Sequence, residues 1–119
     1  NTYVLNNFSY YLSLRNTKLE QAEEMMSVCV KLQPNQSSYE DTYAWVFYQK
    51  KDYKNALIWL EKSIKNGGSS SPTIVEHYGD VLYQLGRNDE ALEQWIKAKE
   101  LGSDSEWIEK KIADKTLYE

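Results

Sequence analysis

The sequence predicts an all-α protein made of stacked helix pairs. Apolar residues recur at helical spacing through most of the chain, as Leu57 and Leu60 do, and no segment alternates with the period of a β-strand. Three alanines, Ala22, Ala56 and Ala91, lie 34 and 35 residues apart. A helical unit that repeats at this interval is typical of a solenoid, in which each helix pair buries its apolar face against its neighbours.

The first repeat is expected over residues 2–36. Leu5, Phe8 and Leu12 fall on one face of its first helix, and Pro34 closes its second helix. This repeat carries one residue more than the others, near the turn between its two helices.

The second repeat is expected over residues 37–71. It begins at Ser37 and Glu40, which match a capping box for the first turn of a helix. The glycine- and serine-rich run over residues 67–71 is expected to be a flexible turn between repeats.

The third repeat, residues 72–103, begins with a proline whose missing N–H costs nothing in a first turn, and Ser71 precedes this proline as the cap. Asn88 is the expected cap of the second helix in this repeat. Gly102 suits the left-handed residue that ends that helix.

A seventh helix, residues 104–117, is expected to cap the open end of the third repeat. Trp107, Ile108 and Ile112 lie on one face and would cover the apolar core. A terminal helix with one polar face keeps a repeat array soluble. The residues expected to contact water are Glu109, Lys110, Lys111, Asp114 and Lys115. Together the predicted helices span residues 2–15, 18–32, 38–50, 53–66, 72–85, 89–101 and 104–117.

Each predicted helix pair carries two small residues that face each other. Ser9, Ala44 and Gly79 stand in the first helices, 12 or 13 residues before the alanines of the second helices. Small side chains are expected at both places because paired helices approach most closely there. The alternative is an irregular helical bundle whose helix pairs only imitate a repeat.

Length and charge exclude several classes of protein. At 119 residues the chain is long enough for a single domain, residues 1–119, with a real core. Its 14 basic and 18 acidic residues give a net charge of −4, which argues against nucleic-acid binding because that requires a basic surface. No apolar stretch approaches the ~18 residues of a membrane helix, so no membrane insertion is expected. The single cysteine, Cys29, allows no internal disulfide and is expected in the core rather than as a reactive thiol.

One motif recurs in the three segments. In the third it runs V-x₂-Y-G-x₂-L over residues 75–82, followed by A-x₃-W over residues 91–95. This resembles the tetratricopeptide pattern W-x₂-L-G-x₂-Y, which is followed by an alanine, three residues and an aromatic. Glu40 departs from the pattern, because that position is usually aromatic. The resemblance implies a right-handed superhelical solenoid of three repeats and a capping helix, with seven helices in all.

Two further segments, DTYAW at residues 41–45 and HYGD at residues 77–80, resemble the C-terminal repeats of large bacterial tetratricopeptide proteins. Such proteins are often associated with the cell envelope and serve as assembly or adaptor modules. The resemblance therefore implies an adaptor and, as its compartment, the bacterial envelope or periplasm. Because the chain opens almost directly in a helical pattern and without a methionine, we expect it to be a fragment of a longer protein.

The resemblance also implies that the first helix of each pair lines a concave groove that binds a partner. The groove residues implied in this way are Tyr3, Asn6, Asn7, Tyr10, Asp41, Thr42, Trp45, Tyr48, Gln49, Thr73, Glu76, His77, Asp80 and Tyr83. This set is aromatic and acidic, and it contains no lysine or arginine. It suits a protein or peptide segment with apolar anchors and positive charge. Without cations the groove is not expected to grip the C-terminal carboxylate of a chaperone tail.

Catalysis is not expected from this sequence. There is no glycine-rich phosphate loop, no paired-histidine metal motif and no nucleophile turn, so we expect no enzyme, cofactor or metal site. His77 lies beside Glu76 and one turn from Asp80, where a structural hydrogen bond is favoured over metal binding. Trp59, on a second helix, would mark a lateral contact if it were exposed.

Two functions remain open from the sequence. The first is a protein-interaction scaffold whose concave groove binds a segment of a partner. The second is the terminal structural part of a longer superhelix, whose groove is filled by its own chain or through self-association. The residues do not identify the partner.

Overall fold

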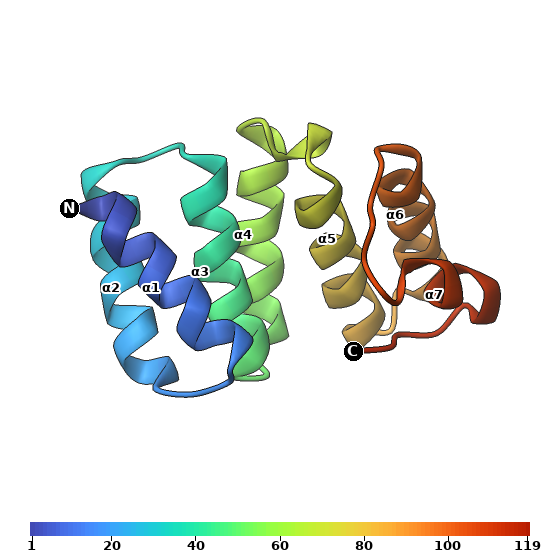
Figure 1. The fold of residues 1–119 in the computed structure, drawn as a ribbon, viewed down its shortest axis with the longest axis horizontal. Helices are drawn as coiled ribbons and strands as arrows, with labels where there is room; N and C mark the ends of the chain where they lie inside the picture. The colour runs from blue at the N-terminus through green and yellow to red at the C-terminus, as the bar shows by residue number, and fades with distance from the viewer.

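The computed structural model describes residues 1–119, and its regular structure is entirely helical. Seven α-helices follow one another along a body of 40 × 26 × 23 Å (Figure 1). They are α1 (Thr2–Leu14), α2 (Leu19–Leu32), α3 (Ser37–Gln49), α4 (Tyr53–Lys65), α5 (Pro72–Gln84), α6 (Asn88–Glu100) and α7 (Ile108–Asp114), with a 3₁₀ turn, η1 (Gly68–Ser70), between α4 and α5. The predicted all-α class is confirmed.

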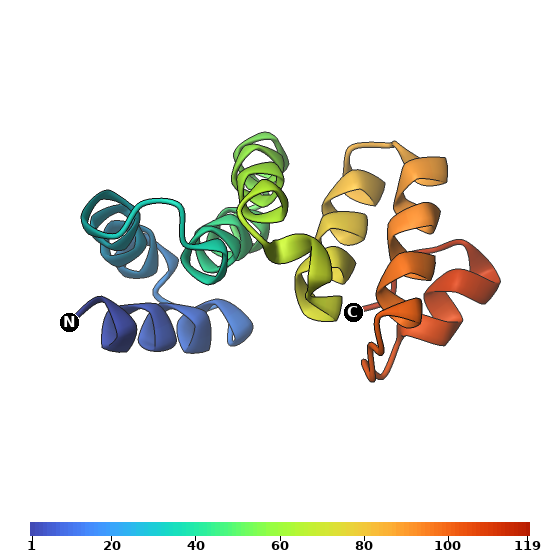
Figure 2. The same cartoon turned by 90° about the horizontal axis from the view of Figure 1, so that it is seen from above.

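The helices pack as pairs that stack in chain order. α1 packs mainly on α2, α3 on α4 and α5 on α6, and successive pairs meet where α2 contacts α3 and α4 contacts α5. Seen from above, the stack turns as it advances, and α7 follows the third pair (Figure 2). α1 also packs along α3, whereas α3 and α5 touch only slightly. This is the helical repeat solenoid that the alanine spacing predicted, rather than an irregular bundle.

The small residues mark the closest approach within each pair, as expected. All six are buried: Ser9, Ala22, Ala44, Ala56, Gly79 and Ala91. The approach is close at Gly79, where an added Cβ would lie 2.5 Å from Cδ1 of Trp95 and 3.1 Å from the carbonyl oxygen of Ala91. Any side chain at Gly79 would therefore collide with a ring that is itself fully buried.

The core runs continuously through the second and third repeats. Trp95 is the largest fully buried side chain, and it packs with residues of α5, α6 and α7. Cys29 is buried as predicted, and its thiol donates a hydrogen bond to the carbonyl oxygen of Thr2. Trp59 is half-buried, with its ring centroid 4.8 Å from that of Tyr43. Trp59 therefore packs within the stack rather than standing free.

Some helix boundaries are confirmed and others are wrong. Ser71 caps α5 by accepting a hydrogen bond from the N–H of Ile74, as predicted. The capping box at Ser37 is absent, since α3 is preceded by Gln36 and no side chain caps it. Glu40 is instead buried and accepts hydrogen bonds from Nδ2 of Asn66, a long-range partner that local sequence does not specify.

Two other turns also differ from the prediction. Asn88 is the first residue of α6 and Arg87 stands at the cap position. Residues 67–71 hold the η1 turn rather than a loose connection, because Gly68 is buried against Ser63. Gly102 has a φ of +101°, the left-handed conformation expected after a helix.

The last helix is shorter than expected and buries one residue that was expected to contact water, although Ile108 is buried and Ile112 packs against the core as predicted. α7 begins at Ile108, not at residue 104, and ends at Asp114. Lys111, which was expected to contact water, is only 3% exposed. The reason is its position three residues after Ile108, on the same face of the helix, which faces carboxylates of α5.

We predict that Gly79→Ala destabilises the protein by about 1–3 kcal/mol, because the new methyl group overpacks the contact with Trp95. Chemical denaturation would measure this change. On helix propensity alone, replacing glycine by alanine would stabilise the helix by about 1 kcal/mol. A measured loss of stability would therefore come from the steric contact with Trp95. The cost should shrink in a Trp95→Phe background, and a stabilised Gly79→Ala protein would contradict the close approach.

Candidate partner-binding groove

The predicted groove residues lie on α1, α3 and α5, and most of them line two cavities. The first cavity, of about 350 Å³, lies between these three helices and is lined by Asn6, Asn7, Tyr10, Ser38, Asp41, Thr42, Ser71, Thr73 and Ile74. The second, of about 190 Å³, lies between α5 and the loop before α7 and is lined by Trp45, Pro72, Thr73, Glu76, His77, Asp80, Ser103, Asp104 and Ser105. Four predicted residues line neither cavity: Tyr3, Tyr48, Gln49 and Tyr83.

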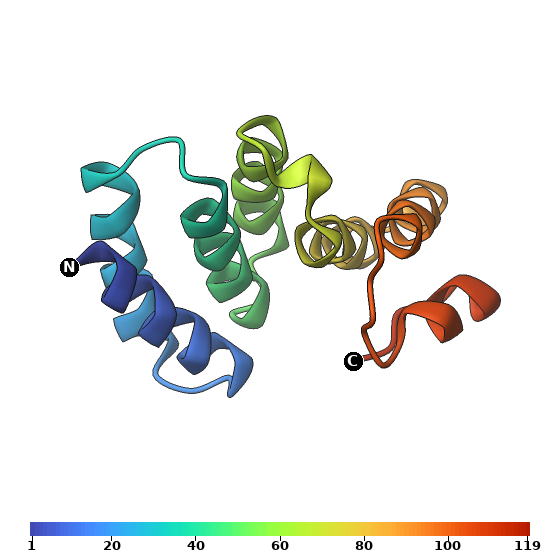
Figure 3. The same ribbon diagram turned by 45° about the horizontal axis from the view of Figure 1, so that its top comes forward.

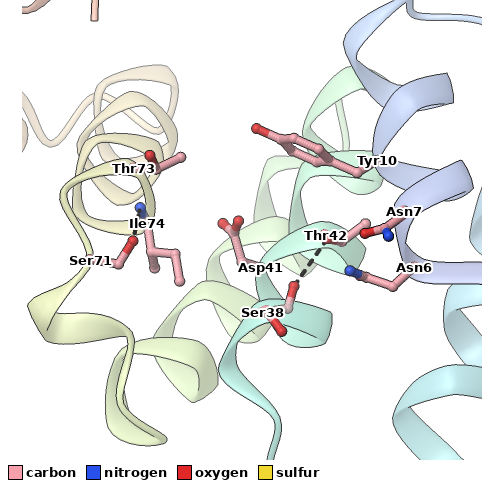
Figure 4. A pocket seen from close by; sticks show the side chains of 9 residues that line it. All are labelled: Asn6, Asn7, Tyr10, Ser38, Asp41, Thr42, Ser71, Thr73 and Ile74. Atoms are coloured by element: carbon pink, nitrogen blue, oxygen red, sulfur yellow. Dashed lines mark hydrogen bonds between the residues drawn. The ribbon is translucent and has the colours of Figure 1, made fainter. Parts of the chain in front are cut away.

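In the first cavity the Asp41 carboxylate rises between Tyr10 of α1 and Thr73 of α5 (Figure 4). Asp41 is 7% exposed, and its Oδ1 accepts a hydrogen bond from Nδ1 of His77 at 2.9 Å. Burial, reinforced by the Asp41 charge, raises the pKa of Tyr10, so its hydroxyl stays protonated. The Thr42 hydroxyl is already used, since it donates to the carbonyl oxygen of Ser38 at 3.0 Å.

An aromatic stack separates the two cavities. The Trp45 ring lies between Tyr48, with centroids 4.2 Å apart, and His77, with centroids 3.8 Å apart. All three side chains are buried. Trp45 and His77 line the second cavity, whereas Tyr48 lines neither cavity. Their position indicates a packing role in addition to any contact with a partner.

Lys111 reaches the concave face from α7 and binds two of its carboxylates. Its Nζ donates to Oε2 of Glu76 at 2.8 Å and to Oδ1 of Asp80 at 2.9 Å. The loop before α7 adds hydrogen bonds from Ser103 and Ser105 to the Glu76 carboxylate, at 2.9 and 2.8 Å. The third-repeat part of the groove is therefore less acidic than the sequence predicted, because the chain supplies its own cation.

The ionisation of this cluster follows from its burial and its charges. Burial raises the pKa of Asp80 to about 6, although Lys111 opposes the shift. Burial also acts on Glu76, but Lys111 and the two serines prevail and lower its pKa. Lys111 has a raised pKa despite its burial, because both carboxylates stabilise the ammonium. The three groups thus form a buried ion-paired unit at neutral pH.

The last residue of the chain also reaches the groove. The Tyr48 hydroxyl donates to Oε2 of Glu119 at 2.8 Å, and Gln84 donates to the Tyr48 oxygen at 3.3 Å. The terminus lies at the lower end of α5 in Figure 1, and Figure 3 shows it on the same side of the stack as α7. Sequence reasoning missed Lys111, Ser103, Ser105 and Glu119 as concave-face residues. Only Lys111 carried a usable signal, its shared face with Ile108.

The structure offers little else that is chemically suggestive. No three histidine, cysteine, aspartate or glutamate side chains converge as metal ligands. No helix has both the length and the apolar character needed to cross a bilayer.

A third cavity, of about 310 Å³, lies among α2, α3 and α4 and contains no predicted groove residue. α1 exposes several apolar side chains, among them Tyr3, Val4, Phe8, Tyr11 and Leu14.

Comparison with known proteins adds two findings. A family model described as tetratricopeptide repeat matches residues 7–114. No curated protein matches the sequence at a significant level.

Solved tetratricopeptide domains are similar in fold. The first such domain of Spaghetti (RPAP3), bound to the HSP90 peptide SRMEEVD, superposes with a TM-score of 0.84 at 13% identity, covering 96% of this chain and 89% of that one. The first domain of human RPAP3, determined by NMR, gives 0.84 at 13%, covering 96% and 88%. The Sgt2 domain from Aspergillus fumigatus gives 0.83 at 12%, covering 96% and 76%.

We predict that Lys111→Met destabilises the attachment of α7 by about 3–5 kcal/mol, because it leaves two buried carboxylates without their cation. Lys97→Met on α6 is the matched control: Lys97 is exposed and should change stability by less than about 0.5 kcal/mol. Urea denaturation together with amide exchange of residues 108–114 would measure both effects. If Lys111→Met and Lys97→Met changed the stability and the amide exchange equally, a buried, ion-paired Lys111 would be contradicted.

We predict a pH dependence that originates at His77. Burial disfavours its imidazolium, but Asp41, Asp80 and Glu76 prevail and raise its pKa. A histidine with a raised folded pKa stabilises the fold below its unfolded pKa and loses this contribution as pH rises through the folded value.

The stability difference between wild type and His77→Gln should therefore be larger near pH 6 than near about pH 8.5. Denaturation of both proteins at the two pH values isolates the histidine, because glutamine does not titrate. A difference that stays constant or grows with pH would contradict the raised pKa.

Proposed function

Because this chain belongs to the tetratricopeptide repeat family, we propose that it is a non-catalytic interaction scaffold whose concave groove binds an extended segment of a partner protein. The observation that carries the proposal is the cavity of about 350 Å³ between α1, α3 and α5. That cavity is open, lies on the concave face and is lined by side chains that can form hydrogen bonds with a peptide backbone. Pockets of this size are typical of ligand sites.

The exposed lining residues are the ones that meet the segment first. Asn7 and Thr73 are exposed and Tyr10 is half-buried, whereas Thr42 is buried and already bonded. Asn7 can both donate to and accept from a backbone amide. Tyr10 and Ile74 provide apolar surface for an anchor side chain. The partner segment is therefore one with an apolar anchor, polar backbone contacts and positive rather than negative charge.

The lining chemistry argues against one kind of partner. The peptide bound by the RPAP3 domain, SRMEEVD, carries more acidic than basic side chains. In this chain no lysine or arginine lines either concave cavity, and the Lys111 ammonium is already held by Glu76 and Asp80. An acidic tail would meet Asp41, and no lysine or arginine of the lining would offset the repulsion. We therefore propose that this groove does not bind acidic chaperone tails.

A second function is favoured by a separate observation. Side chains from the C-terminal segment of the chain occupy the part of the groove that the third repeat forms. Lys111 and Glu119 bind concave-face residues of the third and second repeats. At the other end, Val4, Phe8 and Tyr11 expose apolar surface on α1. A terminal structural unit of a longer superhelix, or a self-associating unit, accounts for both features.

A random peptide library panned on the chain tests the first proposal. We expect selected peptides to lose binding to the double variant Asn7→Ala and Tyr10→Ala, which removes two of the three α1 side chains that line the first cavity. The matched control is Glu93→Ala, which changes an exposed residue of α6 away from the groove. Because Tyr10 also packs against the core, the melting temperatures are measured and binding is compared at a temperature at which every variant is folded.

The same experiment separates the two functions. Peptides that bind wild type and the groove variant equally would contradict a groove-binding scaffold. An absence of selected peptides, with a sedimentation mass that rises with concentration, would favour self-association. Calorimetry with SRMEEVD should show no micromolar complex.

A further inference from the structure

Asp41 differs from the other two acidic residues of the concave face. Glu76 and Asp80 are each bound by Lys111, and Asp80 also accepts a hydrogen bond from Nε1 of Trp95 at 2.9 Å. Asp41 has one protein partner, Nδ1 of His77, and that partner contacts only Oδ1. Its second oxygen, Oδ2, has no hydrogen-bond partner in the protein. One of the two carboxylate oxygens of Asp41 is therefore available for a hydrogen bond from a partner.

The free oxygen faces the first cavity. Figure 4 shows the Asp41 carboxylate pointing into the space between Tyr10 and Thr73, with Asn6 and Asn7 on the wall beyond. The one basic side chain that pairs with Asp41 is His77, which contacts Oδ1. None of the nine lining residues is a lysine or arginine. The cavity thus contains a largely buried carboxylate whose only ion-pair partner is the His77 imidazole.

A second lining residue also lacks a partner. Asn6 is 9% exposed, and its Oδ1 is buried without a hydrogen bond. A buried acceptor that forms no hydrogen bond costs free energy, so its presence beside Asp41 points to an incomplete site. Both atoms are acceptors without a donor in the protein, but Asn6 Oδ1 is shielded from solvent, so Oδ2 of Asp41 is the acceptor that a donor from outside can reach.

We propose that this cavity is a subsite for one basic side chain, lysine or arginine, of the bound segment, with Asp41 as its counter-ion. This subsite rests on the proposed function, because it assigns the positive charge of the partner to a single position in the groove. An ammonium or guanidinium group supplies the donor that Oδ2 of Asp41 lacks, and it adds a positive charge beside a carboxylate that His77 binds only through Oδ1. The hydroxyls of Tyr10 and Thr73 can accept further hydrogen bonds from the same group.

The alternative occupants fit less well. A carboxylate or phosphate would lie against Asp41, and no lysine or arginine of the lining would offset the repulsion. A neutral polar side chain could donate one hydrogen bond to Asp41 but would leave the His77 imidazole as its only ion-pair partner. At Glu76 and Asp80 a basic side chain would have to displace Lys111. The first cavity is therefore the only place on the concave face where a partner's cation meets an available carboxylate.

The test uses a random peptide library panned in parallel on the wild-type chain, on Asp41→Asn and on Glu93→Gln. Asp41→Asn removes the charge at nearly unchanged volume, and Glu93→Gln removes an equal charge from an exposed position on α6. We expect peptides selected on wild type and on Glu93→Gln to share one lysine or arginine position. Peptides selected on Asp41→Asn should lack this preference.

One selected peptide then gives the coupling directly. Replacing its basic residue by norleucine should weaken binding to wild type about tenfold to a hundredfold, which is the range for a hydrogen bond to a charged group. The same replacement should barely change binding to Asp41→Asn. If Asp41→Asn does not fold, the norleucine replacement on the wild-type chain still tests the requirement for the cation.

The failures are distinguishable. Selected peptides that need Asn7 and Tyr10 but show no basic position would overturn the subsite and leave the groove intact. A basic position whose contribution is the same on Asp41→Asn would also overturn it, because the cation would then bind elsewhere. If no peptide binds the groove at all, the proposed function fails together with the subsite.

Discussion

The close approach of α5 and α6 at Gly79 holds together both the third repeat and the concave face beside it. With no side chain at Gly79, the Trp95 ring lies fully buried against α5. Its Nε1 then reaches Asp80, whose carboxylate in turn binds Lys111 of α7. A steric constraint in the core thus positions a groove carboxylate, and that carboxylate fastens the terminal helix.

This arrangement divides the concave face into two parts with different properties. Around Glu76 and Asp80 the chain satisfies its own charges through Lys111, Ser103 and Ser105. Around Asp41 a cavity remains open and a carboxylate oxygen remains free. The two proposed functions would therefore use different parts of one surface, and they do not exclude each other.

Features that depend on local sequence were predicted well. The repeat, its small residues and the cap at Ser71 depend on spacing and on residues a few positions apart, so the helix order and the buried alanines follow from the sequence. Most of the predicted groove residues line two cavities, because the repeat places them on one face of α1, α3 and α5, and their role in binding a partner stays a prediction.

Features that depend on distant partners were not predicted. The carboxylate of Glu40 binds Asn66 of the next helix, and Lys111 binds α5 some thirty residues away. Neither pairing leaves a local pattern. The shortened α7 likewise depends on the loop serines that bind Glu76 instead of starting a helix. The charge of the groove could therefore be judged only with the whole fold in hand.

The central claim is that the part of the groove around Asp41 is open to a partner while the third-repeat part is held by the chain itself. Chemical-shift mapping of the ¹⁵N-labelled chain with a selected peptide tests this most directly. The account predicts the largest shifts at residues 6–10, 38–42 and 71–74, with α7 little changed. Largest shifts in α7 or around the α2–α3–α4 cavity would contradict it.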